Sequence, residues 1–157
     1  MWLPYFRLVL CAVATLALPI TSGAAEAVKV ANAWVRAPVP GQPTAAAYLD
    51  LTSDRNLAVV AAGSPAAGRV EMHSMTVDGG IMRMRALPRI DLPAGKTVKL
   101  SPGGTHLMLL DLKRPMKAGD TVPLVLSLQP TGAGQSSLTT VTVQAEVRAP
   151  GAVEHQH

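Results

Sequence analysis

Turn-forming clusters divide residues 28–147 of this chain into short runs of strand length, and no segment repeats apolar residues with a helical period. Alternation is clearest near the end, where Val141, Val143, Ala145 and Val147 share one side of the run. Many short strands at this spacing predict an all-β sandwich or barrel with Greek-key connections. The predicted strands are 28–36, 44–52, 57–62, 69–77, 81–87, 97–100, 106–112, 122–128 and 138–147.

The amino terminus has the features of a cleaved secretory signal. Arg7 precedes an apolar run, 8–20, that is short for a membrane span, and small residues follow up to Ala25. Leu10 is too large for the position before a lipid-modified Cys11, so we expect no membrane anchor after cleavage. The sequence predicts a signal peptide (1–25), one β-domain (26–149) and a flexible tail (150–157), with the mature protein secreted.

Removal of the signal leaves about 130 residues without cysteine, which excludes disulfides, thiolate metal sites and a blue-copper centre. The remaining charge of about +3 gives no indication of nucleic-acid binding. Two internal histidines without a serine, cysteine or paired-carboxylate partner provide no acid–base constellation, so the chain is not expected to be an enzyme. Trp34 and Tyr48 are the remaining aromatic residues, and we interpret both as buried packing residues.

Two imidazoles and two thioethers stand out between residues 73 and 108: His73, Met84, His106 and Met108. His106 and Met108 are two apart in a predicted strand, so their side chains share a face and can reach one ion. Neutral imidazoles and thioethers favour Cu(I) over hard cations. These residue types therefore predict a copper site.

The run Asp78-Gly79-Gly80 predicts a hairpin that brings His73 near Met84. If Asp78 and Gly79 form a two-residue type I′ turn, His73 lies directly opposite Met84, with Cβ atoms ~4.5–5.5 Å apart. The same register places Arg83 and Arg85 on the opposite face.

A second interpretation is a secreted all-β interaction or adhesion module that binds no metal and whose methionines only fill the core. All six methionines beyond the signal fall within residues 72–116: Met72, Met75, Met82, Met84, Met108 and Met116.

Ten residues separate His73 from Met84, twenty-one separate Met84 from His106, and one separates His106 from Met108. This pattern resembles the signature of the PCu(A)C periplasmic copper chaperones. The surrounding segments 33–38, 78–85, 102–109 and 112–115 also resemble that family, so the similarity covers nearly the whole mature chain.

The resemblance implies that residues 26–149 form a cupredoxin-like β-sandwich in the periplasm, which binds Cu(I) through His73, Met84, His106 and Met108. Met75 and Met82 would flank this site as a replacement pair or an apolar rim, and Met116 would lie in the core. It also implies delivery of copper to a partner, such as a cytochrome oxidase subunit or another copper chaperone, during assembly of the oxidase copper site. Members often carry a His- or Met-rich tail associated with Cu(II), and His155 and His157 form a minimal version here. We expect the chaperone to be a monomer.

Overall fold

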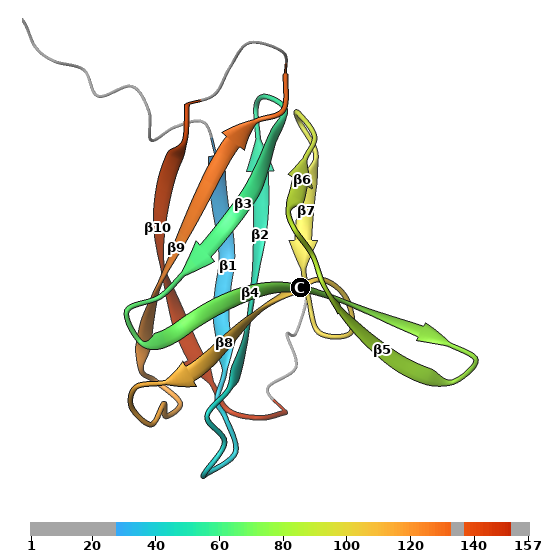
Figure 1. Cartoon of the computed structure of the whole chain (residues 1–157). Coiled ribbons are helices and arrows are strands. Elements are labelled where there is room, and N and C mark those ends of the chain that lie inside the picture. The colour runs from blue at the N-terminus through green and yellow to red at the C-terminus, as the bar shows by residue number, and fades with distance from the viewer. Residues whose placement is uncertain (1–27, 133–136, 152–157) are drawn as a thin grey trace, which may run out of the picture.

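The computed structural model describes residues 28–132 and 137–151, which form ten strands and no helix. Figure 1 shows them around a common interior. Accordingly, this part of the chain contains no helix that could cross a membrane. The strands are β1 (Val28–Arg36), β2 (Ala45–Ser53), β3 (Leu57–Gly63), β4 (Ala67–Asp78), β5 (Ile81–Ala86), β6 (Ile90–Leu92), β7 (Thr97–Leu100), β8 (His106–Leu112), β9 (Thr121–Pro130) and β10 (Thr139–Arg148).

Seven strands close into a barrel in the order β4-β8-β2-β1-β10-β9-β3, with β3 returning to β4 through the pair Ala62 and Val70. β1 and β10 run parallel, whereas the other paired strands are antiparallel. β5, β6 and β7 are additions at the edges of β4, β3 and β2. The predicted all-β, cupredoxin-like fold is confirmed.

Aliphatic side chains fill the barrel. One inner row crosses five strands, because Met72 pairs with Leu107, Leu107 with Ala47, Ala47 with Val35, and Val35 with Val147. Four of these five side chains are at most 1% exposed, and Met72 is 7% exposed. Such burial stabilises a protein by about 25 cal/mol per Å² of apolar surface removed from water. The barrel interior is therefore the main source of stability.

Most predicted strands are confirmed, and three have the predicted bounds: β1, β7 and β8. β6 was missed because three residues are too few to show a period. The predicted strand 122–128 corresponds to β9, which does not end at Leu128 but continues to Pro130. The predicted signal peptide and the end of the tail, with Cys11, His155 and His157, lie outside the described residues.

β4 and β5 form a hairpin that leaves the barrel. Figure 1 shows this arm projecting to one side of the molecule, with its turn far from the barrel strands. All six residues of β5 are exposed, as are the last three of β4. The arm is therefore a two-stranded ribbon whose outer half packs against little else.

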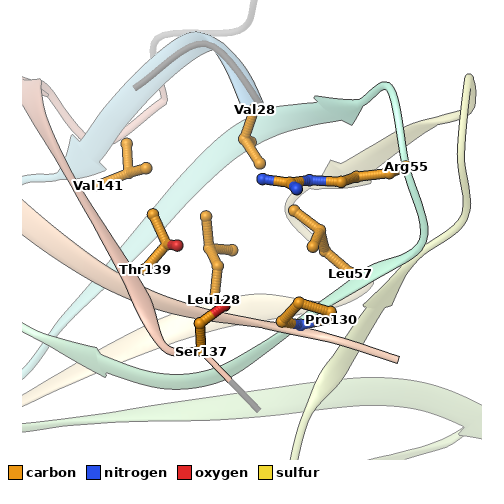
Figure 2. A pocket seen from close by; sticks show the side chains of 8 residues that line it. All are labelled: Val28, Arg55, Leu57, Leu128, Pro130, Ser137, Thr139 and Val141. Carbon is orange, nitrogen blue, oxygen red and sulfur yellow. The ribbon is translucent and has the colours of Figure 1, made fainter. Parts of the chain in front are cut away.

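A cavity of about 310 Å³, open to solvent, lies at one end of the barrel between β1, β3, β9 and β10. Figure 2 shows its lining, in which Arg55 contributes a charged group among mainly aliphatic side chains. None of the four predicted copper ligands lines it. The cavity and the predicted metal site are thus separate features.

Candidate metal centre

His73 and His106 lie directly opposite each other on adjacent strands. They are register partners in β4 and β8, and their ring centroids are 5.8 Å apart at an interplanar angle of 77°. Both rings are on the outer face of the barrel, because their neighbours Met72 and Leu107 point into the interior. Metal–imidazole bonds are about 2 Å long, so one ion between these rings can bind to both.

His106 is held in one tautomer by the loop before it. Its ring is 3% exposed, and its Nδ1 lies 3.1 Å from the carbonyl oxygen of Gly104. A carbonyl only accepts, so Nδ1 carries the proton and donates it. The lone pair is then on Nε2, which becomes the nitrogen available to a metal.

His73 has a corresponding arrangement with the two nitrogens exchanged. Its Nε2 lies 2.9 Å from Oε2 of Glu71, two residues earlier on the same face of β4. This hydrogen bond is the main reason why the pKa of Glu71 is lower than its ordinary value. Nε2–H therefore donates to a carboxylate, which fixes the ring in the way that carboxylates orient metal-binding histidines.

The other ring nitrogen of His73, Nδ1, is buried and has no hydrogen-bond partner. An unsatisfied buried polar atom costs about 1–3 kcal/mol and is rare in folded proteins. A bound metal ion would satisfy this lone pair. Together the two rings therefore offer Nδ1 of His73 and Nε2 of His106 as donors.

The thioethers lie on either side of the imidazole pair. Met108 follows His106 on the same face of β8, pairs with Glu71, and borders a groove of about 510 Å³ with Ala46 and Arg36. Met84 lies on the other side, on the exposed arm, and is 44% exposed. The structure thus places all four predicted ligands on one face of β5, β4 and β8.

The predicted register of the hairpin is wrong by two residues. The turn consists of Gly79 and Gly80, with φ of +56° and +80°, and Asp78 pairs with Ile81. A type I′ turn has positive φ at both central residues, and Gly79 and Gly80 are the two consecutive residues that adopt it here. Met84 therefore lies opposite Met75, and His73 lies opposite Ala86.

Because the shift is an even number of residues, each side chain keeps its predicted face. Met84 is a diagonal neighbour of His73 instead of its direct partner, and diagonal neighbours are ~7–8 Å apart. Arg83 and Arg85 are on the opposite face, as predicted. To bind the same ion as the imidazoles, the flexible side chain of Met84 would have to extend from β5 toward His73 on β4.

An aromatic wall adjoins the imidazole pair, and sequence reasoning did not connect it with the site. The Tyr48 ring centroid is 6.3 Å from His106 and 4.6 Å from Trp34, its partner on β1. Arg36 lies over Tyr48 and Arg148 over Trp34, each 5.5 Å from the ring centroid. Burial raises the pKa of Tyr48, although Arg36 opposes this, so the phenol is neutral.

Both aromatic residues are buried, as expected, but they lie outside the aliphatic cluster in the barrel. The signal for Tyr48 was its alternation with the inward-facing Ala47 and Leu49 on β2. This wall lies beside the ring of His106, which is buried.

The methionines do not form a Met-rich core. Met72 and Met116 are buried, which confirms the expectation for Met116, but Met82 and Met84 are among the most exposed large apolar residues. Among the described residues, no three His, Cys, Asp or Glu side chains are grouped so as to hold a metal ion.

A family model described as "Putative lipoprotein LpqE-like" matches residues 28–147. The chain belongs to the LpqE-like family. A relative among curated proteins, "Putative lipoprotein Lxx21020" of Leifsonia xyli subsp. xyli, is 36% identical over 103 residues. This match covers 65% of the present chain and 62% of the relative, so this LpqE-like chain spans less than two thirds of that protein.

Solved structures of PCuAC domains have the same fold. The copper-bound PCuAC domain from PmoF2 has a TM-score of 0.62 at 25% identity, covering 81% of this chain and 97% of the domain. Apo-DR1885 from Deinococcus radiodurans has a TM-score of 0.56 at 31% identity, covering 94% and 97%. CuI-DR1885 gives 0.58 at 31% identity, covering 82% and 83%. The resemblance of this LpqE-like protein to the PCuAC family is confirmed.

Proposed function

We propose that this LpqE-like protein is a copper chaperone that binds Cu(I) as cargo through His73, Met84, His106 and Met108. The observation that carries the proposal is the buried Nδ1 of His73, which has no partner in the protein and lies beside a second oriented imidazole. Its Nε2–H donates to Glu71, as expected of a metal-binding histidine. The added thioethers favour Cu(I) over zinc and hard cations.

Two relatives of known structure support copper as the cargo. The PmoF2 domain was solved with copper bound, and DR1885 was solved in a Cu(I) form. Both share the fold of the present chain over more than four fifths of its length. A metal carrier, and not an enzyme, is the function that this site and these relatives support together.

The ligand set suits release as well as binding. Four neutral ligands leave the bound ion with its charge of +1, and no thiolate holds it. A partner with stronger donors can then take the ion by ligand exchange. We propose that the partner is a copper-receiving protein outside the inner membrane, in cytochrome oxidase copper-site assembly, and that residues 1–25 direct the chain there.

Two further questions need separate tests: Cu(II) binding by the tail and lipidation of Cys11. We propose that His155 and His157 add a weak Cu(II) site, which deletion of residues 153–157 would remove without affecting Cu(I). The names of the family and of the Leifsonia relative contain the word lipoprotein. Mass spectrometry of the mature chain would distinguish a product cleaved near Ala25 from one lipidated at Cys11.

Cu(I) titration of the mature chain against a colorimetric chelator tests the main proposal. We expect one Cu(I) per chain, and much weaker Cu(I) binding in the His73→Ala/His106→Ala variant. Met108→Leu should weaken binding, whereas Met116→Leu, a matched change of a buried methionine, should not. X-ray absorption should show nitrogen and sulfur neighbours together. Equal affinities of these two leucine variants, or a shell without sulfur, would refute the assignment.

A further inference from the structure

Three methionines share one face of the β4–β5 arm, in line with the imidazole pair. Met75 is the direct partner of Met84, and Met82 is the next residue on that face toward the turn, opposite Val77. Directly opposed residues have Cβ atoms ~4.5–5.5 Å apart, and diagonal neighbours are ~7–8 Å apart. Three rotatable bonds allow each thioether to turn toward a common point.

Packing does not explain why methionine occupies this face. Met82 is 64% exposed and Met84 is 44% exposed, and every other residue of β5 is exposed as well. The methionines that fill the core, Met72 and Met116, are elsewhere and are at most 7% exposed. Exposed large apolar side chains that gather in one place indicate a binding surface.

We propose that Met75, Met82 and Met84 form a second metal site, built from three thioethers, that binds a soft monovalent cation such as Cu(I) or Ag(I). Thioether sulfur selects soft ions, and between His73 and the turn this face of the arm carries Val77 and the three methionines but no carboxylate or thiolate. Asp78 is at the turn, and its Cα partner is Ile81. Divalent hard cations therefore have no ligands here.

Two arginines on the back of the arm limit which ions can bind. Arg83 and Arg85 point to the face opposite the methionines, and neither forms an ion pair with a described carboxylate. Both are exposed, so their repulsion is screened over the ~8 Å Debye length of physiological salt. The repulsion increases with the charge of the ion, which favours a monovalent over a divalent cation.

Met84 belongs both to the proposed Cu(I) site with the imidazoles and to the three-thioether site. If the proposed function holds, this shared ligand allows an ion to pass between the two sites. An ion held by Met75, Met82 and Met84 can pass to His73 and His106 by exchanging the outer thioethers for imidazole, while Met84 stays bound. The same exchange in reverse brings copper to the exposed end of the arm. The arm would then be the place where the metal enters and leaves.

Ag(I) titration of the His73→Ala/His106→Ala variant tests the second site without the first. At about pH 5 the tail imidazoles are protonated and do not compete, whereas thioethers do not titrate. With methionine methyl groups labelled for NMR, we expect the signals of Met75, Met82 and Met84 to shift and saturate at one Ag(I) per chain. The signals of Met72, Met108 and Met116 should not move.

Adding Met75→Leu and Met82→Leu to this background should lower Ag(I) affinity on the order of tenfold or more, whereas adding Met116→Leu should not. If the alanine variant does not fold by circular dichroism, the His73→Gln/His106→Gln variant, which also lacks both imidazoles, provides the same readout. An unshifted Met82 methyl, or equal affinities of the leucine variants, would overturn the thioether site. Failure of the proposed function would give a different result, namely that the wild-type protein does not bind Cu(I) at neutral pH.

Discussion

In the barrel strand β9, every second residue from Val122 to Leu128 is buried, whereas both faces of β5 in the arm are exposed. β9 shows the first pattern, with Val122, Leu124, Leu126 and Leu128 all inside. β5 shows the second, although its sequence also alternates, here between arginine and methionine. An alternating sequence therefore shows that the two faces of a strand differ in residue type. Only the tertiary structure shows whether one of these faces lies in the interior.

The difference separates stability from metal binding. Residues that hold the barrel together point inward, and the predicted ligands are on the outer face or on the arm. A substitution in one region should leave the property of the other largely unchanged. Three variants, one of them a double substitution, test this separation.

The largest effect is expected from Leu124→Ala. Leu124 is fully buried, so its truncation leaves a cavity and should lower the free energy of unfolding by about 2–5 kcal/mol in urea denaturation. Cu(I) affinity of the folded fraction should be unchanged. Met82→Ala is the control, since an exposed residue should change stability by at most ~0.5 kcal/mol. A similar loss in both variants would contradict the separation of the two regions.

An intermediate effect is expected from Glu71→Ala, which acts between the two regions. Without its acceptor, the ring of His73 loses its fixed tautomer, and Cu(I) affinity should fall about 10–100-fold. Competition titration at pH 7 measures this. The pKa of Glu71 is lowered in the folded state, so the hydrogen bond is intact at pH 7 and is lost as the pH falls through that lowered pKa.

Glu146→Ala is the matched control for Glu71→Ala. Glu146 accepts a hydrogen bond from Arg148, two residues along the same strand, and Arg148 lies over Trp34, but neither residue forms a hydrogen bond with His73 or His106. Its replacement should not change Cu(I) affinity. If the two glutamate variants bind Cu(I) equally, Glu71 has no positioning role.

The smallest effect is expected from Gly79→Ala with Gly80→Ala in the turn of the arm. Both residues have positive φ, where a Cβ costs roughly 1–2 kcal/mol per residue. Hydrogen exchange of the β4–β5 amides should accelerate, while global unfolding should change little because the arm contributes little to the core. Gly63→Ala is the control, as its φ is not positive and the added Cβ has open space. Unchanged exchange in the double variant would show that the turn does not hold the arm.

Several features were determined by the sequence alone. Glycine and proline clusters fixed where strands end, because they carry the backbone conformations of turns, and alternation fixed which residues share a face. The spacing of His106 and Met108 was sufficient to place both on one face of β8. The faces of Met84 and Arg83 were correct even though the register was not, since an even shift preserves the face.

Other features were decided only by tertiary structure. The strand β1 contains a register shift between Ala31 and Trp34, where Asn32 has a φ of +51° and donates to Asp50. This extra residue changes the face of the residues after it, so Trp34 stacks on Tyr48 outside the barrel. A bulge is set by the strand pairing and not by local preference, so the sequence pattern did not show it.

The choice between two possible hairpin turns had the same origin. Asp78-Gly79 and Gly79-Gly80 both suit a two-residue turn, and only the pairing of the complete strands selects between them. The contacts of Glu71 with His73 and of Gly104 with His106 each join residues two apart in the chain, but the two rings face each other only because β4 pairs with β8. The sequence therefore determined the types of the predicted ligands and their faces, while the pairing of β4 with β8 brought the two imidazoles together.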